Sequence, residues 1–285
     1  MFRIKILLYE ADERFQSPEA ELQLALQQLG FVAEFADRSQ QDLGLDPERI
    51  AEFVNATPCD AWIVFAASRG ILRWFAKQPF PFLAVFGNFV NGHAGIGPSH
   101  QQALEACLGE LIRLGHQNIS MFARKERRGP VPGPVEQLLI QTLEKEEIPI
   151  KDDTLPEWEE SLSGFRACLA SLFERDPPSA IIFQEPELVM AAQQFFASQG
   201  LKIPENVSLF CCDYDPRFEW SVPTIAHSKW DYKEVVQRAL AWARNVSSGK
   251  TDEEVTIMVA QFVPGGTIAP PPSDKWNRET TGKVW

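Results

Sequence analysis

The segment 201–215, LKIPENVSLFCCDYD, holds the residue types best suited to chemistry, because two cysteines and two aspartates follow a short apolar run. Neighbouring residues of an extended strand point to opposite faces, so Cys211 and Cys212 cannot easily form a disulfide with each other. We interpret both thiols as small apolar side chains of a buried strand. Asp213 then stands at the end of that strand, where its carboxylate either binds a ligand or caps the loop that follows.

The rest of the chain carries no pattern typical of an enzyme or a metal site. Five cysteines are present, an odd number without a CxxC spacing, and the four histidines stand apart from them. Zinc sites need closely spaced ligands, and the sequence lacks the glycine-rich signatures of phosphate-binding loops and serine hydrolases. We therefore expect no catalytic residue, no metal and no cofactor. The cysteine pattern favours a reducing, cytoplasmic location.

Composition narrows the partners of the chain. Its 285 residues are 45% hydrophobic and 23% charged, which is typical of a soluble globular protein. The net charge of −12 argues against DNA binding by this chain alone, because phosphate binding needs clustered Lys and Arg side chains. No apolar run reaches the roughly 18 residues of a membrane span. The opening MFRIKILLYEADERF does not resemble a signal peptide, because its apolar stretch is short and acidic residues follow at once.

Short apolar runs alternate with amphipathic segments along the chain. We expect strands at 3–9, 31–36, 61–67, 80–87, 118–123, 179–184, 207–213 and 254–263, and helices at 17–30, 46–56, 68–77, 99–114, 135–146, 157–175, 186–199 and 230–247. The proline- and glycine-rich stretch 124–134 reads as a loop without helix. The alternation predicts an α/β fold with parallel sheets and helices on both faces, and the number of strands favours two lobes.

Four segments, in the same order and at the same spacing, carry a resemblance to a known family. They are ELIRLGHQNIS (110–120), the run 177–215, VPTIAH (222–227) and QFVPGGTIAPP (261–271). Together they resemble the effector-binding domain of LacI/GalR transcription regulators. The resemblance implies the class I fold of periplasmic binding proteins, with two Rossmann-like lobes, three crossing segments and a ligand between the lobes. The lobes expected on this basis are 1–117 with 227–250 and 118–226 with 251–272, followed by a tail at 273–285.

The resemblance also marks ligand positions, although several residues depart from the family. Asp213 occupies the position of the family's ligand-binding aspartate. The family's Asn-Asp pair is Glu185-Pro186 here, and the arginine that grips effectors aligns near Val135. The aspartate that opens the long helix aligns with Ser99, and the closing arginine aligns with Pro264. The identity of the ligand therefore does not carry over.

Candidate ligand residues follow from strand ends, because ligands bind at the carboxyl ends of parallel strands. They are Tyr9, Ser68, Arg69, Arg124, Glu185 and Asp213, to which the rings of Phe15 and Trp220 add faces for stacking on a sugar. Arg69 replaces the missing arginine or is a solvated first-turn residue. Arg124 begins a basic loop that holds an anionic effector or is merely solvated. Each aromatic ring is alternatively part of ordinary packing.

Two functions fit these observations. The first is the ligand-sensing domain of a LacI/GalR-like regulator, a homodimer that binds a sugar or sugar derivative and controls DNA through a separate head. No helix-turn-helix precedes residue 3, so we expect that head to be absent from this chain. The alternative is an extracytoplasmic solute-binding protein of a transporter, because the two classes share the fold. The five cysteines favour the first.

Overall fold

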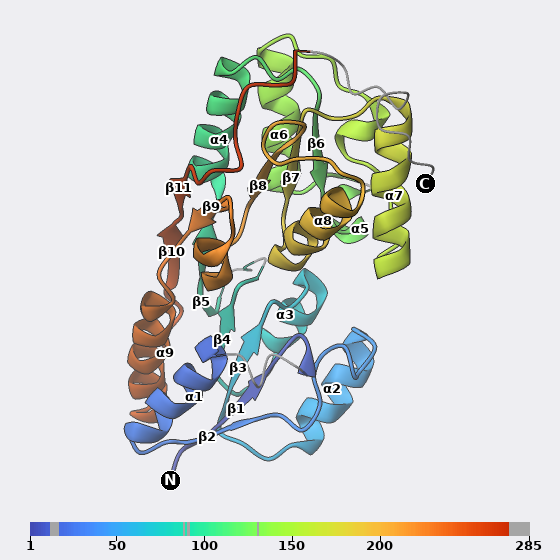
Figure 1. The fold of residues 1–285 in the computed structure, drawn as a ribbon. Helices are drawn as coiled ribbons and strands as arrows, with labels where there is room; N and C mark the ends of the chain where they lie inside the picture. Colours follow the sequence, from blue (N-terminus) through green and yellow to red (C-terminus); the bar gives the residue numbers. More distant parts are fainter. Residues whose placement is uncertain (12–16, 88, 90–91, 130, 274–285) are drawn as a thin grey trace. The chain divides into compact units, whose positions relative to one another are not determined.

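The chain folds into two compact α/β units, each assembled from separate stretches of sequence (Figure 1). The computed structural model describes residues 1–11, 17–87, 89, 92–129 and 131–273. Unit 1 comprises Met1–Ser99 and Asp231–Met258, and unit 2 comprises His100–Trp230 and Val259–Trp285. The α/β class with parallel sheets is thereby confirmed, and the backbone passes from one unit to the other three times.

Unit 1 contains a six-stranded sheet in the order β10-β5-β4-β3-β1-β2, in which β1 to β5 run parallel. Its strands are β1 (Arg3–Leu7), β2 (Val32–Phe35), β3 (Ala61–Phe65), β4 (Phe82–Val85), β5 (Ala94–Ser99) and β10 (Val255–Val259). Its helices are α1 (Ser17–Gln28), α2 (Pro47–Ala56), α3 (Arg69–Phe75) and α9 (Tyr232–Ser247). Helix α2 begins where the sequence predicts, because Asp46 Oδ1 accepts a hydrogen bond from Glu48 N at 2.8 Å and Pro47 takes the first helical position.

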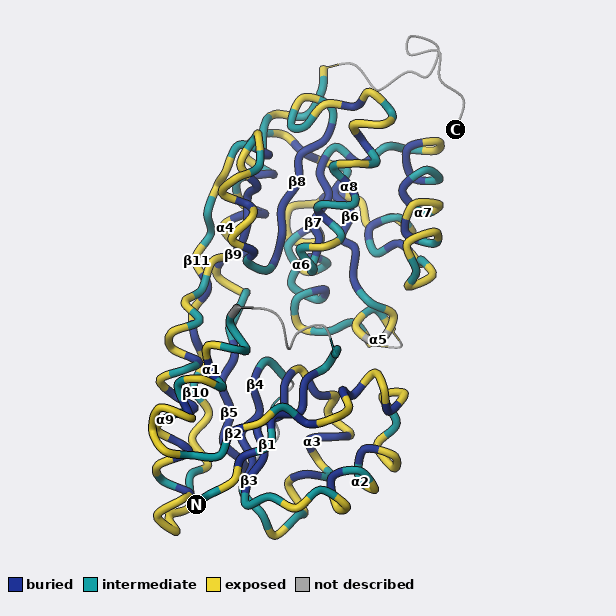
Figure 2. The backbone as a smooth tube through the Cα atoms, turned by 60° about the horizontal axis from the view of Figure 1, so that its bottom comes forward, coloured by how far each residue is buried: buried dark blue, intermediate teal, exposed yellow. Residues whose placement is uncertain are grey.

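Helices pack on both faces of the unit 1 sheet, which explains the unbroken apolar runs of its central strands. All of β3 is buried, and Figure 2 shows the central strands of both sheets in the colour of buried residues. Trp62 and Val64 of β3 share a core cluster with Ile50 of α2 and Phe75 of α3. Helices α1 and α9 contact each other, and α9 also packs on β4 and β5.

The glycine-rich strand β5 was not among the predicted strands, because glycine is depleted in sheets. Its glycines make room for an aromatic ring: a Cβ on Gly95 would lie 2.7 Å from the ring of Phe89, and one on Gly97 would lie 3.1 Å from it. Glycine in a strand often marks such a close approach. The ring therefore replaces the packing that larger side chains of β5 would supply.

Unit 2 contains a five-stranded sheet in the order β11-β9-β8-β7-β6, parallel except for β11. Its strands are β6 (Ile119–Phe122), β7 (Ala180–Phe183), β8 (Ser208–Cys211), β9 (Ala226–Lys229) and β11 (Gln261–Val263). Its helices are α4 (Gln101–Arg113), α5 (Lys125–Arg128), α6 (Pro134–Lys145), α7 (Leu162–Arg175) and α8 (Pro186–Ser198), with short 3-10 helices at Asp152–Thr154 and Pro216–Trp220. The short helix α5 corrects the expectation of a loop without helix at 124–134.

The two adjacent cysteines lie on opposite sides of the unit 2 sheet, as predicted. Cys211 belongs to the core cluster that contains Phe165 of α7 and Phe196 of α8, whereas Cys212 belongs to the cluster that contains Leu139 of α6. Both thiols are buried and free. Burial in apolar surroundings raises the pKa of both thiols, which keeps them protonated and unreactive.

The crossings between units fall at 99/100, 230/231 and 258/259, which corrects the predicted boundaries at 117, 226 and 250. Helix α4 belongs to unit 2, because Leu104 and Leu111 pack in the cluster of Phe210 and Ala226. The predicted strand 254–263 is two strands in different sheets, since β10 is a neighbour of β5 and β11 pairs with β9. None of the helices in the described residues is long and apolar enough to cross a membrane.

Candidate functional site

The carboxyl ends of β3 and β4 in unit 1 carry two residues in a backbone conformation that is rare outside glycine. Ala66 has φ +45° and Phe86 has φ +55°, and their N–H groups donate to Val85 O and Ile96 O. Such residues cost on the order of 1–3 kcal/mol each and cluster at functional sites. Propensity and pattern give no sign of them in the sequence. They mark this edge of the sheet as a candidate ligand surface.

Three predicted ligand residues lie near this edge of unit 1. Ser68 caps α3, because its Oγ accepts a hydrogen bond from Ile71 N at 3.4 Å. Arg69 is the first residue of α3, and its side chain is exposed, with no ion pair to any described residue. Tyr9 follows β1 and is half-buried. Phe15, the fourth candidate of this unit, lies outside the described residues.

Asp213 follows β8 in unit 2, as the sequence predicts for a carboxylate at the end of a buried strand. Its Oδ1 accepts hydrogen bonds from Tyr214 N at 2.8 Å and from Trp230 Nε1 at 2.9 Å. Burial raises the pKa of Asp213, and these two bonds act in the opposite direction. The capping and ligand-binding interpretations are compatible, because Oδ2 accepts no hydrogen bond from the described residues.

Arg124 and Glu185 are both predicted to contact a ligand, and in the structure they form an ion pair with each other. Arg124 Nε donates to Glu185 Oε1, and Arg124 Nη2 donates to Glu185 Oε2 at 3.0 Å. The residues follow β6 and β7, which are neighbours in the sheet, so the topology brings them together. The planar guanidinium matches both carboxylate oxygens, and this geometry orients each side chain.

The contact between Gln184 and Glu136, next to this ion pair, was not predicted from the sequence. Gln184 follows β7, and its Nε2 donates to Glu136 Oε1 and lies 3.9 Å from Met121 Sδ. Glu136 lies in the first turn of α6 and is 0% exposed. An acidic residue in a first turn reads as an ordinary helix-start signal, so its burial could not be foreseen.

Trp220 lies at the end of the 3-10 helix Pro216–Trp220 and is 87% exposed. Val222, two residues later, is 97% exposed. Neither side chain is part of a core cluster among the described residues. Ordinary core packing therefore does not explain Trp220.

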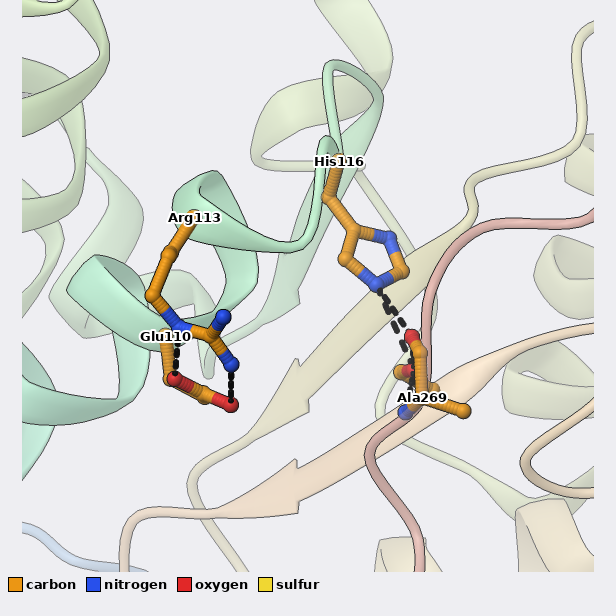
Figure 3. Close-up of polar contacts among 5 residues, drawn as sticks. Glu110, Arg113, His116 and Ala269 are labelled. Carbon is orange, nitrogen blue, oxygen red and sulfur yellow. Dashed lines mark hydrogen bonds and ion pairs between the residues drawn. The ribbon is translucent and has the colours of Figure 1, made fainter.

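His116, in the segment ELIRLGHQNIS (110–120), has a structural role in unit 2. Its Nε2 donates to Ala269 O at 2.8 Å (Figure 3). Its Nδ1 lies 2.8 Å from Ser179 Oγ. Burial lowers the pKa of His116, although the bond to Ala269 opposes this, so the ring is held neutral. Glu110 and Arg113 pair on the solvent side of α4 in the same view. The histidine thus fixes the closing segment of the chain to the sheet.

No group of three or more His, Cys, Asp or Glu side chains in the described part of the chain is arranged to hold a metal ion.

The sequence of residues 108–268, more than half of the chain, matches the family described as periplasmic binding protein-like domain. The chain belongs to the periplasmic binding protein-like domain family. No curated protein matches it in sequence.

Solved structures show how far this periplasmic binding protein-like fold extends along the chain. The Escherichia coli transcriptional repressor ascG superposes with a TM-score of 0.70 at 15% identity, covering 94% of this chain and 100% of its own. A LacI family regulator from Enterococcus faecium with bound ribose gives 0.72 at 18% identity, covering 94% and 99%. One from Arthrobacter sp. FB24 in complex with lactose gives 0.76 at 15% identity, with the same coverage. At these identities the similarity establishes the fold.

Proposed function

We propose that this chain is the ligand-sensing domain of a LacI/GalR-like transcription regulator. Its effector is a small molecule, a sugar or sugar derivative, that binds at the carboxyl ends of the parallel strands. Asp213 carries the proposal, because its half-buried carboxylate keeps Oδ2 without a hydrogen bond from the described residues, and such an oxygen is suited to accept hydrogen bonds from ligand hydroxyl groups. Relatives of the same fold with bound ribose and lactose support a carbohydrate. The proposal assigns no catalytic residue.

Ligand binding is tested by a thermal-shift screen of the purified chain against neutral, acidic, phosphorylated and amino sugars. A ligand at 100 times its Kd stabilises the folded state by about 2.7 kcal/mol, which moves the melting temperature by several degrees. Asp213→Asn is expected to weaken binding of any hit by about tenfold, because it exchanges a charged acceptor for a neutral one. A hit whose affinity is unchanged by Asp213→Asn would contradict the assignment of this site.

If the protein is a transcription regulator, as proposed, it has a DNA-binding head outside these residues and is located in the cytoplasm. Five free thiols among the described residues support a reducing compartment. Intact mass and amino-terminal sequencing of the protein from its source cells test this directly. A basic segment with two helices at helix-turn-helix spacing is the expected result. A cleaved export signal would instead identify a solute-binding protein of a transporter.

We further propose that the sensor works as a homodimer in which Trp220 and Val222 are buried. Their exposures of 87% and 97% support this, because burial of exposed apolar surface favours association and tryptophan is enriched among the residues that dominate interface binding. Sedimentation equilibrium at micromolar concentration tests it. Trp220→Ala is expected to shift a dimer toward monomer, whereas Leu162→Ala, which removes another exposed apolar side chain, leaves the state unchanged. A wild-type chain that is still monomeric at about 100 µM, the highest concentration of the series, would overturn the proposed dimer.

A further inference from the structure

We propose that Trp230 is a positioning residue of the effector site, and that its indole N–H fixes the carboxylate of Asp213 so that Oδ2 is the oxygen that meets the ligand. This inference rests on the proposed function, because it assigns a role within the site that Asp213 defines. It follows from how the hydrogen-bonding capacity of Asp213 is divided between the protein and a ligand.

The two carboxylate oxygens of Asp213 have different surroundings. Oδ1 accepts hydrogen bonds from Tyr214 N at 2.8 Å and from Trp230 Nε1 at 2.9 Å. An ionised carboxylate has about four acceptor sites, two on each oxygen, so these two donors fill Oδ1. Oδ2 accepts no hydrogen bond from the described residues. Rotation of the carboxylate would break both bonds, and Oδ2 is therefore the oxygen that remains available to a ligand.

The two donors to Oδ1 hold Asp213 in different ways. Tyr214 N belongs to the next residue, so its bond moves with the loop and does not tie that loop to any other element. Trp230 lies 17 residues further along the chain, just after β9. Strands β8 and β9 are neighbours in the sheet, and Cys211 pairs with His227. The bond from Trp230 thus fixes the end of β8 to the end of β9.

The backbone on either side of Trp230 is itself held in place. Lys229 ends β9 and forms an ion pair with Glu219 at 2.7 Å. Asp231 caps α9, because its Oδ1 accepts a hydrogen bond from Lys233 N at 2.9 Å. A side chain whose own support is rigid can orient its partner, and the indole of Trp230 meets this condition. The second crossing between units also follows Trp230, so the crossing and the effector site share this residue.

Trp158, another half-buried tryptophan of unit 2, shows what an indole needs when packing is its only role. Its Nε1 donates to the carbonyl oxygen of Ala123 at 2.9 Å, and this neutral acceptor satisfies the N–H group. Trp230 donates to a carboxylate instead, which gives a stronger bond. Burial raises the pKa of Asp213, and the bond from Trp230 is the largest of the effects that lower it. Trp230 therefore acts on the charge of the ligand-binding group as well as on its orientation.

The first test needs no ligand. Each of the eight tryptophans gives one indole N–H signal in a proton–nitrogen NMR spectrum, and Trp230→Phe identifies the signal of Trp230. That signal is expected to move in Asp213→Asn, because its charged acceptor becomes neutral, whereas the signal of Trp158 stays in place. A Trp230 signal that does not move in Asp213→Asn would overturn the proposal.

The second test measures sugar affinity by isothermal titration at about pH 8 and about pH 5.5. Trp230→Phe is expected to weaken the sugar that binds best by about threefold to tenfold, with the larger loss at the lower pH. Without the indole N–H the pKa of Asp213 rises, so acid neutralises more of its carboxylate. Glu185 raises and Arg127 lowers the same pKa, and both residues are present in wild type and variant alike. The sugars are ribose, lactose, glucose, glucose 6-phosphate, glucuronate and glucosamine.

Trp158→Phe is the matched control, because it removes an indole hydrogen bond of the same length from the same unit. It should change sugar affinity by less than about twofold at either pH. A packing role of Trp230 would lower stability in urea and leave the pH dependence of sugar affinity unchanged. A loss of affinity in Trp230→Phe that is the same at both pH values would therefore overturn the proposal.

The remaining outcomes separate this inference from the proposed function. Sugar binding that Asp213→Asn weakens and Trp230→Phe leaves unchanged would overturn the inference, with the sensor function intact. Absence of binding by every sugar of the set at about 10 mM would overturn the proposed function and this inference with it.

Discussion

Arg124 and Glu185 lie 61 residues apart in the sequence and form a two-pronged ion pair at the ends of neighbouring strands, with Arg124 Nη2 3.0 Å from Glu185 Oε2. The pair joins the loop after β6 to the start of α8. Both residues are candidate ligand contacts, and in the described structure each is the other's partner. The ion pair therefore orients both side chains at the carboxyl edge of unit 2.

The strength of this ion pair is measurable by a double-mutant cycle. Arg124→Gln, Glu185→Gln and the double variant are unfolded in urea, and the coupling free energy is the departure from additivity. The side chains are 29% and 27% exposed, so we expect about 0.5–1 kcal/mol, in the range of partly solvated pairs. A coupling near zero would show that the two charges do not stabilise each other in solution.

Glu185→Gln has a second expected effect, because it removes the carboxylate that binds Arg124 Nε and Nη2. A guanidinium binds phosphate and carboxylate through two parallel hydrogen bonds. The variant is therefore expected to bind glucose 6-phosphate about tenfold more tightly than the wild type in isothermal titration. Glu187→Gln, which changes the next carboxylate of α8 and leaves the ion pair intact, is the control. An unchanged affinity for the phosphate would show that Glu185 does not mask Arg124.

Acidification is expected to destabilise the protein between pH 7 and pH 5. Burial lowers the pKa of His100, His116 and His227, to about 4 for His100 with a contribution from the charge of Arg127. The unfolded chain then binds more protons than the folded one below about pH 6.5, so stability falls as pH falls, by about 2 kcal/mol for His100 and by smaller amounts for the other two histidines. Urea unfolding across this range measures the slope.

His116→Gln tests the contribution of one of these histidines to the stability of the protein. It is expected to lose about 1–3 kcal/mol at pH 7, because the contacts with Ala269 O and Ser179 Oγ are broken or lengthened. Its stability should also change less between pH 7 and pH 5 than that of the wild type. An equal pH slope in both proteins would contradict a neutral, buried His116.

Gly265→Ala is expected to be strongly destabilising. Gly265 has φ +54°, and a Cβ would lie 2.5 Å from Ala226 N and 2.6 Å from Ile225 C, both of which are backbone atoms of the β9 region. Gly249 also has a positive φ, of +78°, but its Cβ would meet nothing within 4 Å. Gly249→Ala therefore measures the conformational cost alone, about 1 kcal/mol, and Gly265→Ala should exceed it by about 2 kcal/mol or more in chemical unfolding. Equal losses would rule out the clash.

The ion pair between Arg238 and Asp252 is expected to matter more than those on the surface. Their side chains are 7% and 4% exposed, and Asp252 also accepts a hydrogen bond from Asn245 at 2.8 Å. Asp252→Asn leaves a buried arginine without its charged partner and should cost about 3 kcal/mol. Glu110→Gln breaks an exposed pair with Arg113 and should cost less than about 0.5 kcal/mol. Similar losses in the two variants would contradict the burial of the first pair.

The sequence was sufficient to predict the α/β class and the buried strands, because both depend on local patterns. The run 61–67 is apolar throughout, and β3 is indeed buried on both faces. Cys211 and Cys212 fall on opposite faces for the same reason, since strand periodicity is local. The position of Asp213 after β8 also follows from the end of an apolar run.

Features that depend on distant contacts could not be predicted. The crossing at 99/100 is set by the packing of α4 on the unit 2 sheet, and an amphipathic helix carries no mark of which sheet it covers. The pairing of Arg124 with Glu185 and the burial of Glu136 both require knowledge of strand order. The αL conformation of Ala66 and Phe86 has no signal in their residue types.

The threefold passage of the backbone between units has a consequence for how the protein is made. Residues 100–230 leave the ribosome before 231–258, so unit 2 acquires most of its sheet while unit 1 still lacks α9 and β10. Unit 1 therefore stays incomplete, with β5 at an open edge, until nearly the whole chain has been translated. A stop codon anywhere before residue 255 removes the last strand of the amino-terminal half, so truncation near the carboxyl terminus damages the part of the molecule that was synthesised first.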